Sequence, residues 1–377
     1  MIANGHKLVR FTMDNCSIKS LSRNTLLRQT FWNGNTIKDI RDLIRSEQID
    51  LIHSHNTFPL ISPSIYSAAS REGIPIVQTL HNYRLICAAA TLSRGGAPCK
   101  QCITSKTMAP AILHRCYHDS VASTLAVVGM LQSHRVLGTW SRKVTRYIAL
   151  TEFMRQMLIE GGIPAGKISV KPNFSPIDLT PRRSLGQHAL FVGMIVQGKG
   201  INTLVEAWSH LPSFPLKIAG GGPEEPMLAQ NVRDKPHISV MGIQSQAQIQ
   251  ELMRNSCCLV VPSLWYEGFP MVIAEAFSAG IPVIVSGHGG MAEIVKDGVT
   301  GLHFKPGDAA DLAAKAAWLA EHPQEALRMG SAARAEFEDK YTARANYRIL
   351  LDIYQEALDT NATGKARRTQ PLAPTLK

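Results

Sequence analysis

Residues 267–275 have the sequence EGFPMVIAE, and they follow a short apolar run, CLVVPS, at residues 258–263. The apolar run predicts a buried β-strand, and the residues after Pro270 predict a helix. Glu267 lies before this helix and Glu275 lies two turns into it. Free N–H groups at a helix N-terminus suit a phosphate or a hydroxyl-rich ligand, and Glu275 would be able to reach a ribose diol. An ordinary capped helix with one acidic face would show the same spacing.

The alternation of strand and helix extends in both directions from this stretch. Apolar runs predict strands at 49–55, 74–81, 147–151, 168–170, 189–193, 216–220, 258–263 and 282–286, with helical patterns such as 37–47 and 62–72 between them. This order predicts an α/β fold of two doubly wound, Rossmann-like domains that face each other across a cleft. The expected parts are residues 1–175, residues 176–340, a helix at 341–358 that crosses back to the first domain, and a flexible tail at 359–377.

Length and composition exclude several classes of protein. The chain has 377 residues, 45% hydrophobic and 18% charged, so it is long enough for two domains and too apolar to be disordered. No secretory signal is visible, and polar residues interrupt the most apolar stretch, 121–137, which predicts a buried or interfacial helix and not a membrane span. Seven cysteines without an export signal indicate a reducing compartment.

The net charge of +11 is concentrated in one part of the chain. Residues 82–150 contain nine Lys and Arg and one acidic residue, whereas residues 151–360 contain 18 basic and 22 acidic residues. A basic balance suggests an anionic partner. The acidic second half and the lack of an aromatic-basic module argue against nucleic acid. The basic stretch is therefore either a surface for an anionic membrane or a solvated face.

Several motifs, taken in order, resemble the retaining glycosyltransferases of family 4, which have the GT-B fold. The EGFPMVIAE stretch matches the Glu-x7-Glu motif of that family. The other pieces are KPN at 171–173, FVG at 191–193 with Lys199-Gly200, IAGGGP at 218–223, and the GG-x-x-EIV and DG-x-x-G patterns at 289–295 and 297–301. The likeness runs from about residue 1 to about residue 358. It implies that residues 1–175 form the acceptor-side domain and residues 176–340 the nucleotide-sugar donor domain.

The resemblance also implies roles for individual residues. Glu267 and His81 would be the catalytic residues, with Glu267 facing the donor hexose, and Glu275 would bind the ribose. Gly193 and Lys199 would bind the donor in the first loop of its domain, where Lys199 would neutralise the leaving diphosphate. The backbone of five consecutive residues would hold the sugar and the distal phosphate: Gly268, Phe269, Pro270, Met271 and Val272. The donor would be a nucleotide sugar, and no catalytic metal is expected.

One position departs from the family pattern. The family usually has an arginine directly after the glycine of the first donor-domain loop, but this chain has Met194. One of the two cations expected at the diphosphate is therefore missing. Either another basic residue substitutes for it, or donor turnover is weak.

Three histidines end predicted strands of the first domain. His81 is followed by Asn82-Tyr83-Arg84, and the family places a histidine at this point, near the donor sugar and the acceptor. His53 and His55 end the preceding strand, where they would either line the acceptor side or be ordinary loop histidines.

A cysteine cluster lies inside the basic stretch. Cys87, Cys99, Cys102 and Cys116 follow the spacing Cys-x11-Cys-x2-Cys-x13-Cys, which would allow a structural tetrahedral zinc, with His114 and His118 as spare ligands. The alternative is a set of reduced, partly buried thiols. Cys257 and Cys258 lie on a predicted strand and are expected in the core.

The beginning of the chain also departs from the family. Family members open with a strand, a glycine-rich loop and a helix, followed by a second strand. Residues 4–12, NGHKLVRFT, instead predict a helix C-cap followed directly by the second strand. We therefore expect the first strand and its glycine loop to be missing. Either the natural start lies upstream or this form is a degenerate copy, and its activity depends on which applies.

The resemblance implies transfer of a hexose, with retained configuration, from a nucleotide sugar to a glycan or lipid-linked acceptor in bacterial surface polysaccharide synthesis. The expected location is cytoplasmic, peripheral on the inner face of the cytoplasmic membrane. Two alternatives remain open from the sequence. One is a sugar-nucleotide epimerase of similar fold, and the other is a non-catalytic nucleotide-sugar-binding protein.

Overall fold

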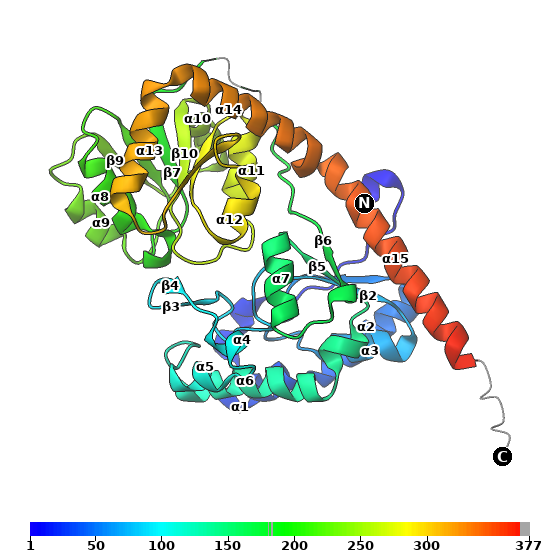
Figure 1. Ribbon diagram of the computed structural model, residues 1–377. Helices are drawn as coiled ribbons and strands as arrows, with labels where there is room; N and C mark the ends of the chain where they lie inside the picture. The colour runs from blue at the N-terminus through cyan, green and yellow to red at the C-terminus, as the bar shows by residue number, and fades with distance from the viewer. Residues whose placement is uncertain (180, 182–183, 370–377) are drawn as a thin grey trace.

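The structure is a computed structural model that describes residues 1–179, 181 and 184–369. Two parallel sheets, each covered by helices, lie one above the other in Figure 1. The elements of the first half are α1 (Arg23–Phe31), α2 (Gly34–Glu47), β1 (Ile52–Ser54), α3 (Ser64–Glu72), β2 (Ile76–Thr79), β3 (Ser93–Arg94), β4 (Ala97–Pro98), α4 (Gln101–Thr104), α5 (Ala109–Leu113), α6 (Val121–Val136), β5 (Arg146–Ala149), α7 (Glu152–Glu160) and β6 (Ile168–Val170).

The second half repeats the pattern with more strands. Its elements are β7 (His188–Val192), α8 (Ile201–Ser209), β8 (Leu216–Ala219), α9 (Glu225–Asn231), β9 (Ile238–Gly242), α10 (Gln246–Arg254), β10 (Ser256–Val261), α11 (Met271–Ser278), β11 (Val283–Ser286), α12 (Gly289–Ile294), β12 (Gly301–Phe304), α13 (Ala309–Glu321), α14 (Pro323–Glu336) and α15 (Ala343–Thr369).

Each half has a parallel sheet in the order expected of crossover connections. The first has the order β1-β2-β5-β6 and the second β12-β11-β10-β7-β8-β9, and every pairing within them is parallel. All six residues of β10 are buried, because this strand lies inside its sheet and helices cover both faces. The predicted α/β fold with two doubly wound units is confirmed.

The last helix connects the two halves. Helix α15 runs from the second half down along the first sheet (Figure 1). Its Ile353 and Ala357 pack in one buried cluster with Val77 of β2 and Ile148 of β5. The predicted crossing back to the first domain is therefore confirmed. The helix continues to Thr369, so the predicted tail is wrong for residues 359–369, and residues 370–377 lie outside the described residues.

The N-terminal segment differs from the prediction. A short 3-10 helix at Ile2–Asn4 ends at Gly5, whose left-handed φ of 82° confirms the predicted C-cap. The strand predicted after it is wrong, because residues 6–14 form neither helix nor strand. Leu8 is 46% exposed, and His6 bonds to the hydroxyl of Tyr347 on α15 at 2.8 Å. This segment thus contacts α15 at His6 and α2 through the Lys7–Glu47 ion pair, and it lies outside the first sheet.

Candidate functional site

Glu267 and Lys199 form an ion pair after the carboxyl ends of β10 and β7. Lys199 Nζ lies 2.7 Å from Glu267 Oε1, and the two side chains are only 20% and 14% exposed. The same oxygen accepts hydrogen bonds of 2.7 Å from Ser263 Oγ and from the indole N–H of Trp265. Three donors on one oxygen hold the carboxylate in a single orientation. The structure thus brings together two residues that lie far apart in the predicted motifs.

Glycines allow the loops to approach closely enough for this pair to form. A Cβ on Gly198 would overlap the ring of Trp265, and a Cβ on Gly200 would overlap the carbonyl oxygen of Pro262. Gly200 also has a left-handed φ of 74°, which L side chains rarely adopt. Lys199 lies between these two glycines. Because both glycines pack closely against the loop after β10, the amine of Lys199 lies next to Glu267.

The loop that begins at Gly193 is fixed in a similar way. A Cβ on Gly220, in the next loop, would overlap the carbonyl oxygen of Gly193. The N–H of Gly193 donates to the carbonyl oxygen of Ala219 at 3.0 Å. Met194, which follows, is 59% exposed, so its side chain occupies a surface position where a longer cation would fit.

Helix α11 places the remaining motif residues beside the ion pair. Pro270 precedes it without a side-chain cap, and the N–H groups of Met271 and Val272 in its first turn have no intrahelical acceptor. Phe269 is buried and packs edge to face on Tyr341, with ring centroids 5.6 Å apart. The helix N-terminus is therefore anchored while its first amides remain available to a ligand.

Glu275 lies on the second turn of α11, apart from the ion pair. It is partly buried, and burial raises the pKa of its carboxyl. Across the part of the chain that the structure describes, no hydrogen bond to this carboxylate is found. It lines a pocket with Ile177, Leu179, Val192, Gln244, Gln246, Ile249, Gln250 and Met253. The carboxylate and three glutamine amides give this pocket a polar wall suited to a ligand with several hydroxyl or amide groups.

His81 reaches the same region from the first half. A Cβ built on Gly268 would lie 3.1 Å from the carbonyl oxygen of His81, so the two predicted catalytic residues, His81 and Glu267, lie on adjoining loops. Burial, followed by the charges of His55 and Lys171, lowers the pKa of His81 to about 4. His81 is thus a neutral imidazole at pH 7, able to donate or accept a hydrogen bond.

Sequence reasoning missed two connections between the halves. Lys100 Nζ lies 5.7 Å from the ring centroid of Phe153 and 5.7 Å from that of Tyr266, the residue before Glu267. Both oxygens of Glu293 on α12 accept N–H groups of the α7 N-terminus, those of Glu152 and Phe153, at 2.7 Å. The basic stretch and the late GG-x-x-EIV pattern contained these residues, but nothing in their spacing indicated a contact across the halves.

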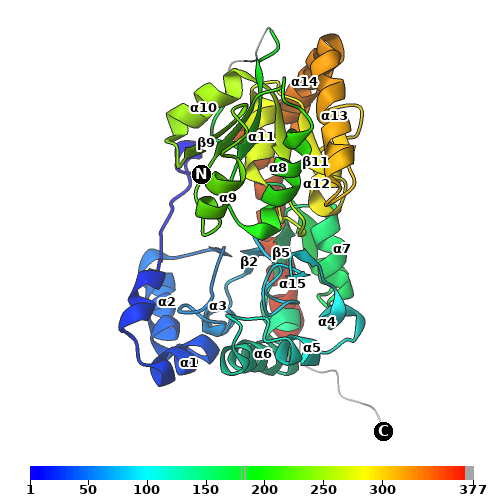
Figure 2. The same ribbon diagram turned by 90° about the vertical axis from the view of Figure 1, so that its left-hand side faces the viewer.

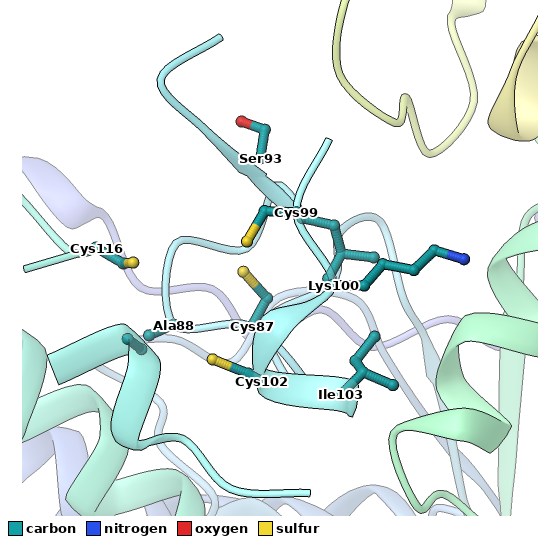
Figure 3. Close-up of a pocket in the computed structure, with 10 residues that line it drawn as sticks. Cys87, Ala88, Ser93, Cys99, Lys100, Cys102, Ile103 and Cys116 are labelled. Atoms are coloured by element: carbon teal, nitrogen blue, oxygen red, sulfur yellow. The ribbon is translucent and has the colours of Figure 1, made fainter. Parts of the chain in front are cut away.

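The four predicted cysteine ligands converge on one small pocket. Figure 3 shows the sulfurs of Cys87, Cys99 and Cys102 turned toward a common space, with Cys116 at its edge, while the amine of Lys100 points away from them. All four thiols are reduced, and burial raises the pKa of Cys102 to about 11.

The zinc site predicted from these cysteines is not found. Within residues 1–179, 181 and 184–369, no group of three or more His, Cys, Asp or Glu side chains is arranged to hold a metal ion. His114 and His118, the spare ligands, are exposed and do not line the pocket. The alternative of reduced, partly buried thiols describes the cluster. Cys257 and Cys258 lie buried on β10, as predicted.

None of the helices that the structure describes could span a membrane, because none combines the length and the apolar character needed to cross a bilayer. Helix α6, which covers most of the apolar stretch predicted as a buried or interfacial helix, packs its Val127, Val128, Met130 and Leu131 into the core.

Comparison with known proteins places both halves in described families. Residues 18–179 match the family described as Glycosyltransferase Family 4, and residues 185–336 match Glycosyl transferases group 1. The amylovoran biosynthesis glycosyltransferase AmsK of Erwinia amylovora is 28% identical over 225 residues, which are 55% of each chain. The phosphatidyl-myo-inositol mannosyltransferase of Mycobacterium leprae is 28% identical over 207 residues, 52% of this chain and 54% of that one. The chain spans about half the length of the curated relatives it matches.

Solved structures show the same fold. The crystal structure of Anabaena Alr3699/HepE in complex with UDP has a TM-score of 0.63 at 19% identity, over 85% of this chain and 82% of that chain. The two parallel sheets and the returning helix are those of the GT-B architecture. The chain belongs to the GT-B glycosyltransferases of family 4 type, with a Glycosyltransferase Family 4 first half and a Glycosyl transferases group 1 second half.

Proposed function

We propose that the chain is a retaining glycosyltransferase that moves a hexose from a nucleotide sugar to a glycan or lipid-linked acceptor in bacterial surface polysaccharide synthesis. The observation that carries this proposal is the Lys199–Glu267 ion pair beside the uncapped N-terminus of α11, with Glu275, which has no partner among the described residues, on the same helix. Cationic and N–H donors there oppose the charge that develops on a leaving diphosphate. The relatives named for amylovoran biosynthesis and for phosphatidyl-myo-inositol mannosylation support the acceptor class.

The roles follow from the positions of the side chains. The bond between the anomeric carbon and the phosphate oxygen breaks, and the electron pair leaves with the nucleoside diphosphate. The acceptor hydroxyl oxygen bonds to the same face of the anomeric carbon, and its proton passes to the leaving diphosphate. Lys199 and the first amides of α11 stabilise that anion. Glu267, oriented by Trp265 and Ser263, faces the hexose. Glu275 binds the ribose in its pocket, and His81 meets the hexose and the acceptor hydroxyl from the opposite side.

The two halves have different roles in this proposal. Residues 176–340 bind the donor, residues 1–175 bind the acceptor, and α15 joins them. No residue of this scheme requires a metal, because Lys199 and the helix dipole supply the positive charge. We place the protein on the inner face of the cytoplasmic membrane, where helices α5 and α6 and the basic stretch at 82–150 would contact anionic lipid.

The deciding experiment incubates the purified chain with a panel of labelled nucleotide sugars, including UDP-glucose, and candidate acceptors. We expect transfer to an acceptor with the donor's anomeric configuration, observed by NMR of the product. We also expect loss of transfer in Lys199→Met but not in the matched variant Lys235→Met, whose half-buried lysine contacts the neighbouring Asp234 and the carbonyl oxygen of Asn231. An epimerised donor without transfer, or tight donor binding without any turnover, would overturn the proposal in favour of an epimerase or a binding protein.

A further inference from the structure

His55 and His81 form a direct imidazole–imidazole hydrogen bond at the carboxyl edge of the first sheet. Nδ1 of His55 lies 2.9 Å from Nε2 of His81. The ring planes differ by only 20°, so each nitrogen lies close to the plane of the other ring. The proton and the lone pair of an imidazole both lie in its ring plane, so this is a favourable hydrogen-bond geometry and not only a ring contact.

At neutral pH this bond forms between two neutral rings that carry their protons at complementary positions, one as donor and one as acceptor. One of the two nitrogens must carry the proton and the other must offer its lone pair. Burial is the main cause that lowers the pKa of both His55 and His81, and the charge of the nearby Lys171 lowers both further. Both rings are therefore neutral at pH 7, and the proton position on one fixes the proton position on the other.

The His55 ring is itself held by its neighbours. His53 lies beside it with ring centroids 4.5 Å apart. His53 bonds through Nδ1 to the hydroxyl of Tyr354 on α15 at 2.6 Å and through Nε2 to Thr79 at 2.7 Å. The backbone carbonyl of His55 accepts from the Gln78 amide at 2.6 Å. His53, held between β1, β2 and α15, and the anchored backbone of His55 thus limit the positions that the His55 ring can take.

The second ring nitrogen of His81 belongs to a residue whose backbone adjoins the proposed donor site. With Nε2 of His81 bonded to His55, no hydrogen-bond partner for its Nδ1 is found among the residues that the structure describes. The His81 backbone adjoins Gly268, one residue after Glu267. A neutral imidazole has one protonated nitrogen. If the bond to His55 makes Nε2 of His81 an acceptor, Nδ1 of His81 is a donor, and if Nε2 is the donor, Nδ1 is an acceptor.

We propose that His55 is a positioning residue that sets the tautomer and the ring orientation of His81 for hydrogen bonding to the transferred hexose or the acceptor hydroxyl. This proposal rests on the function proposed above for His81. His55 touches neither the sugar nor the diphosphate in this scheme; it acts through His81 alone.

The first test needs no substrate. Protein labelled with ¹⁵N-histidine is observed by long-range ¹H–¹⁵N NMR at pH 7.5, with His81→Ala used to assign the His81 ring. We expect one protonated and one bare nitrogen on His81, with a coupling across the N–H···N bond to His55. In His55→Ala the two His81 nitrogen shifts should move toward each other as the tautomers mix. An unchanged His81 pattern in His55→Ala would overturn the proposal even if the chain proved to be a glycosyltransferase.

The second test uses turnover. His55→Ala should lower kcat for transfer about tenfold or more, with little change in KM for the nucleotide sugar. His55→Asn should restore most of the rate, because its side-chain amide occupies the position of Nδ1. His114→Ala, at an exposed histidine away from the site, is the matched control and should match the parent. Equal rates for His55→Ala and the parent, or equal losses in His55→Ala and His55→Asn with unchanged melting temperatures, would contradict the positioning role. Absence of transfer in the parent itself would instead count against the proposed function, and the NMR result would still decide the histidine pair.

Discussion

The carboxylate of Glu267 receives three donors on a single oxygen, which leaves its other oxygen for a ligand. Glu267→Gln keeps the size of the side chain but removes the charge that holds Lys199. We expect transfer to fall by about 10²-fold or more, since comparable losses follow removal of one preorganised polar group from an active site. Nucleoside diphosphate binding should persist, because Lys199 and the α11 amides remain. Steady-state transfer rates and calorimetry with UDP measure the two effects separately.

The matched control for this change is Glu206→Gln, at an exposed glutamate on α8. It should leave both the rate and the affinity unchanged. A Glu267→Gln enzyme that transfers sugar at the parental rate would remove Glu267 from the catalytic scheme.

Met194 occupies the position where the family pattern implies a second cation for the diphosphate. Its side chain is 59% exposed, so Met194→Arg is expected to fold without displacing core atoms. An added charge-assisted hydrogen bond to phosphate is worth about 1.5–3 kcal/mol. We therefore expect binding of UDP to be about 10-fold to 150-fold tighter by calorimetry.

Met227→Arg provides the control, because Met227 on α9 is a similarly exposed methionine, at 44%, in the same half. Tighter binding in both variants would indicate a general charge effect. Unchanged or weaker binding in Met194→Arg would place the diphosphate elsewhere.

At the residue scale, the sequence indicated which residues lie together where each is fixed by its own motif, whereas the roles of these residues stay predictions. Glu267, Lys199 and the α11 turn lie together, because each follows the carboxyl end of a strand in one sheet. The bond from Trp265 to Glu267 was not predictable, because it depends on the path of a nine-residue loop, 262–270, packed over Gly198. The cysteine spacing correctly gathered four thiols, but spacing alone does not set the sulfur positions that a metal requires.

At the scale of elements, His53 joins strands β1 and β2 to helix α15. Burial is the first cause that lowers its pKa to about 3, and the charges of His55, Lys171 and His81 add to it. The unfolded chain binds this proton near the ordinary pKa of about 6.5, whereas the native state does not bind it until about pH 3. The unfolded state therefore holds more protons in that window, and the free energy of unfolding should fall as the pH drops from about 6.5 toward 3.

His53→Gln should reduce this acid sensitivity, because the variant side chain does not titrate. Urea unfolding at pH 7.5 and pH 4.5 measures the difference for each protein. His81 and His188 also have a pKa lowered to about 4, so the variant should flatten the pH dependence only in part. An equal loss of stability on acidification in the parent and the variant would contradict the assignment.

Helix α7 of the first half begins at a carboxylate supplied by the second. Glu293 accepts two N–H groups at 2.7 Å each, and Thr151 caps a third, that of Met154, at 3.1 Å. Glu293→Ala removes a charged cap and should lower the free energy of unfolding by about 1 kcal/mol. Urea unfolding would detect this change. Glu206→Ala is the exposed control, and equal stability of the two variants would show that the cap contributes nothing.

The elements themselves were largely predictable. Eight of the nine predicted strands form, because short apolar runs that end in polar residues can be buried only inside a parallel sheet. The strand expected near residues 9–12 does not form, since a period-2 pattern also fits an extended segment that lies outside a sheet. The two-residue strands β3 and β4 have too few residues to show any period.

At the scale of the whole molecule, the proposed site exists only where the two halves meet. The β3–β4 hairpin of the first half reaches the donor loop, since a Cβ on Gly96 would lie 3.4 Å from the side chain of Gln197. Lys100, in the same segment, lies against Tyr266. Such contacts join residues about 100 to 170 positions apart, so no local pattern predicts them.

The face of the first half that carries α5 and α6 has both features of a membrane-binding surface. These helices lie at the lower end of the molecule, away from the second half (Figure 2). Val121, Leu125 and Val136 recur at helical spacing on one side of α6 and are 47%, 49% and 82% exposed. Leu113 at the end of α5 is 76% exposed, and the exposed Arg115 that follows it pairs with Asp119 at 3.8 Å. Apolar side chains flanked by basic ones suit an anionic lipid surface.

Flotation with phosphatidylcholine vesicles, with and without phosphatidylglycerol, measures this binding. We expect binding only to the anionic vesicles and its loss when salt is raised, because the Debye length falls from about 10 Å at 0.1 M to about 3 Å at 1 M. Leu125→Glu should weaken binding about tenfold, since it removes apolar contact and adds repulsion in one step. Val299→Glu, at a valine 45% exposed in the second half, should bind as the parent does. If the protein bound neutral and anionic vesicles equally, or if the two substitutions had the same effect, this face would be an ordinary solvated surface and not a membrane-binding one. The acceptor would then reach the site from solution.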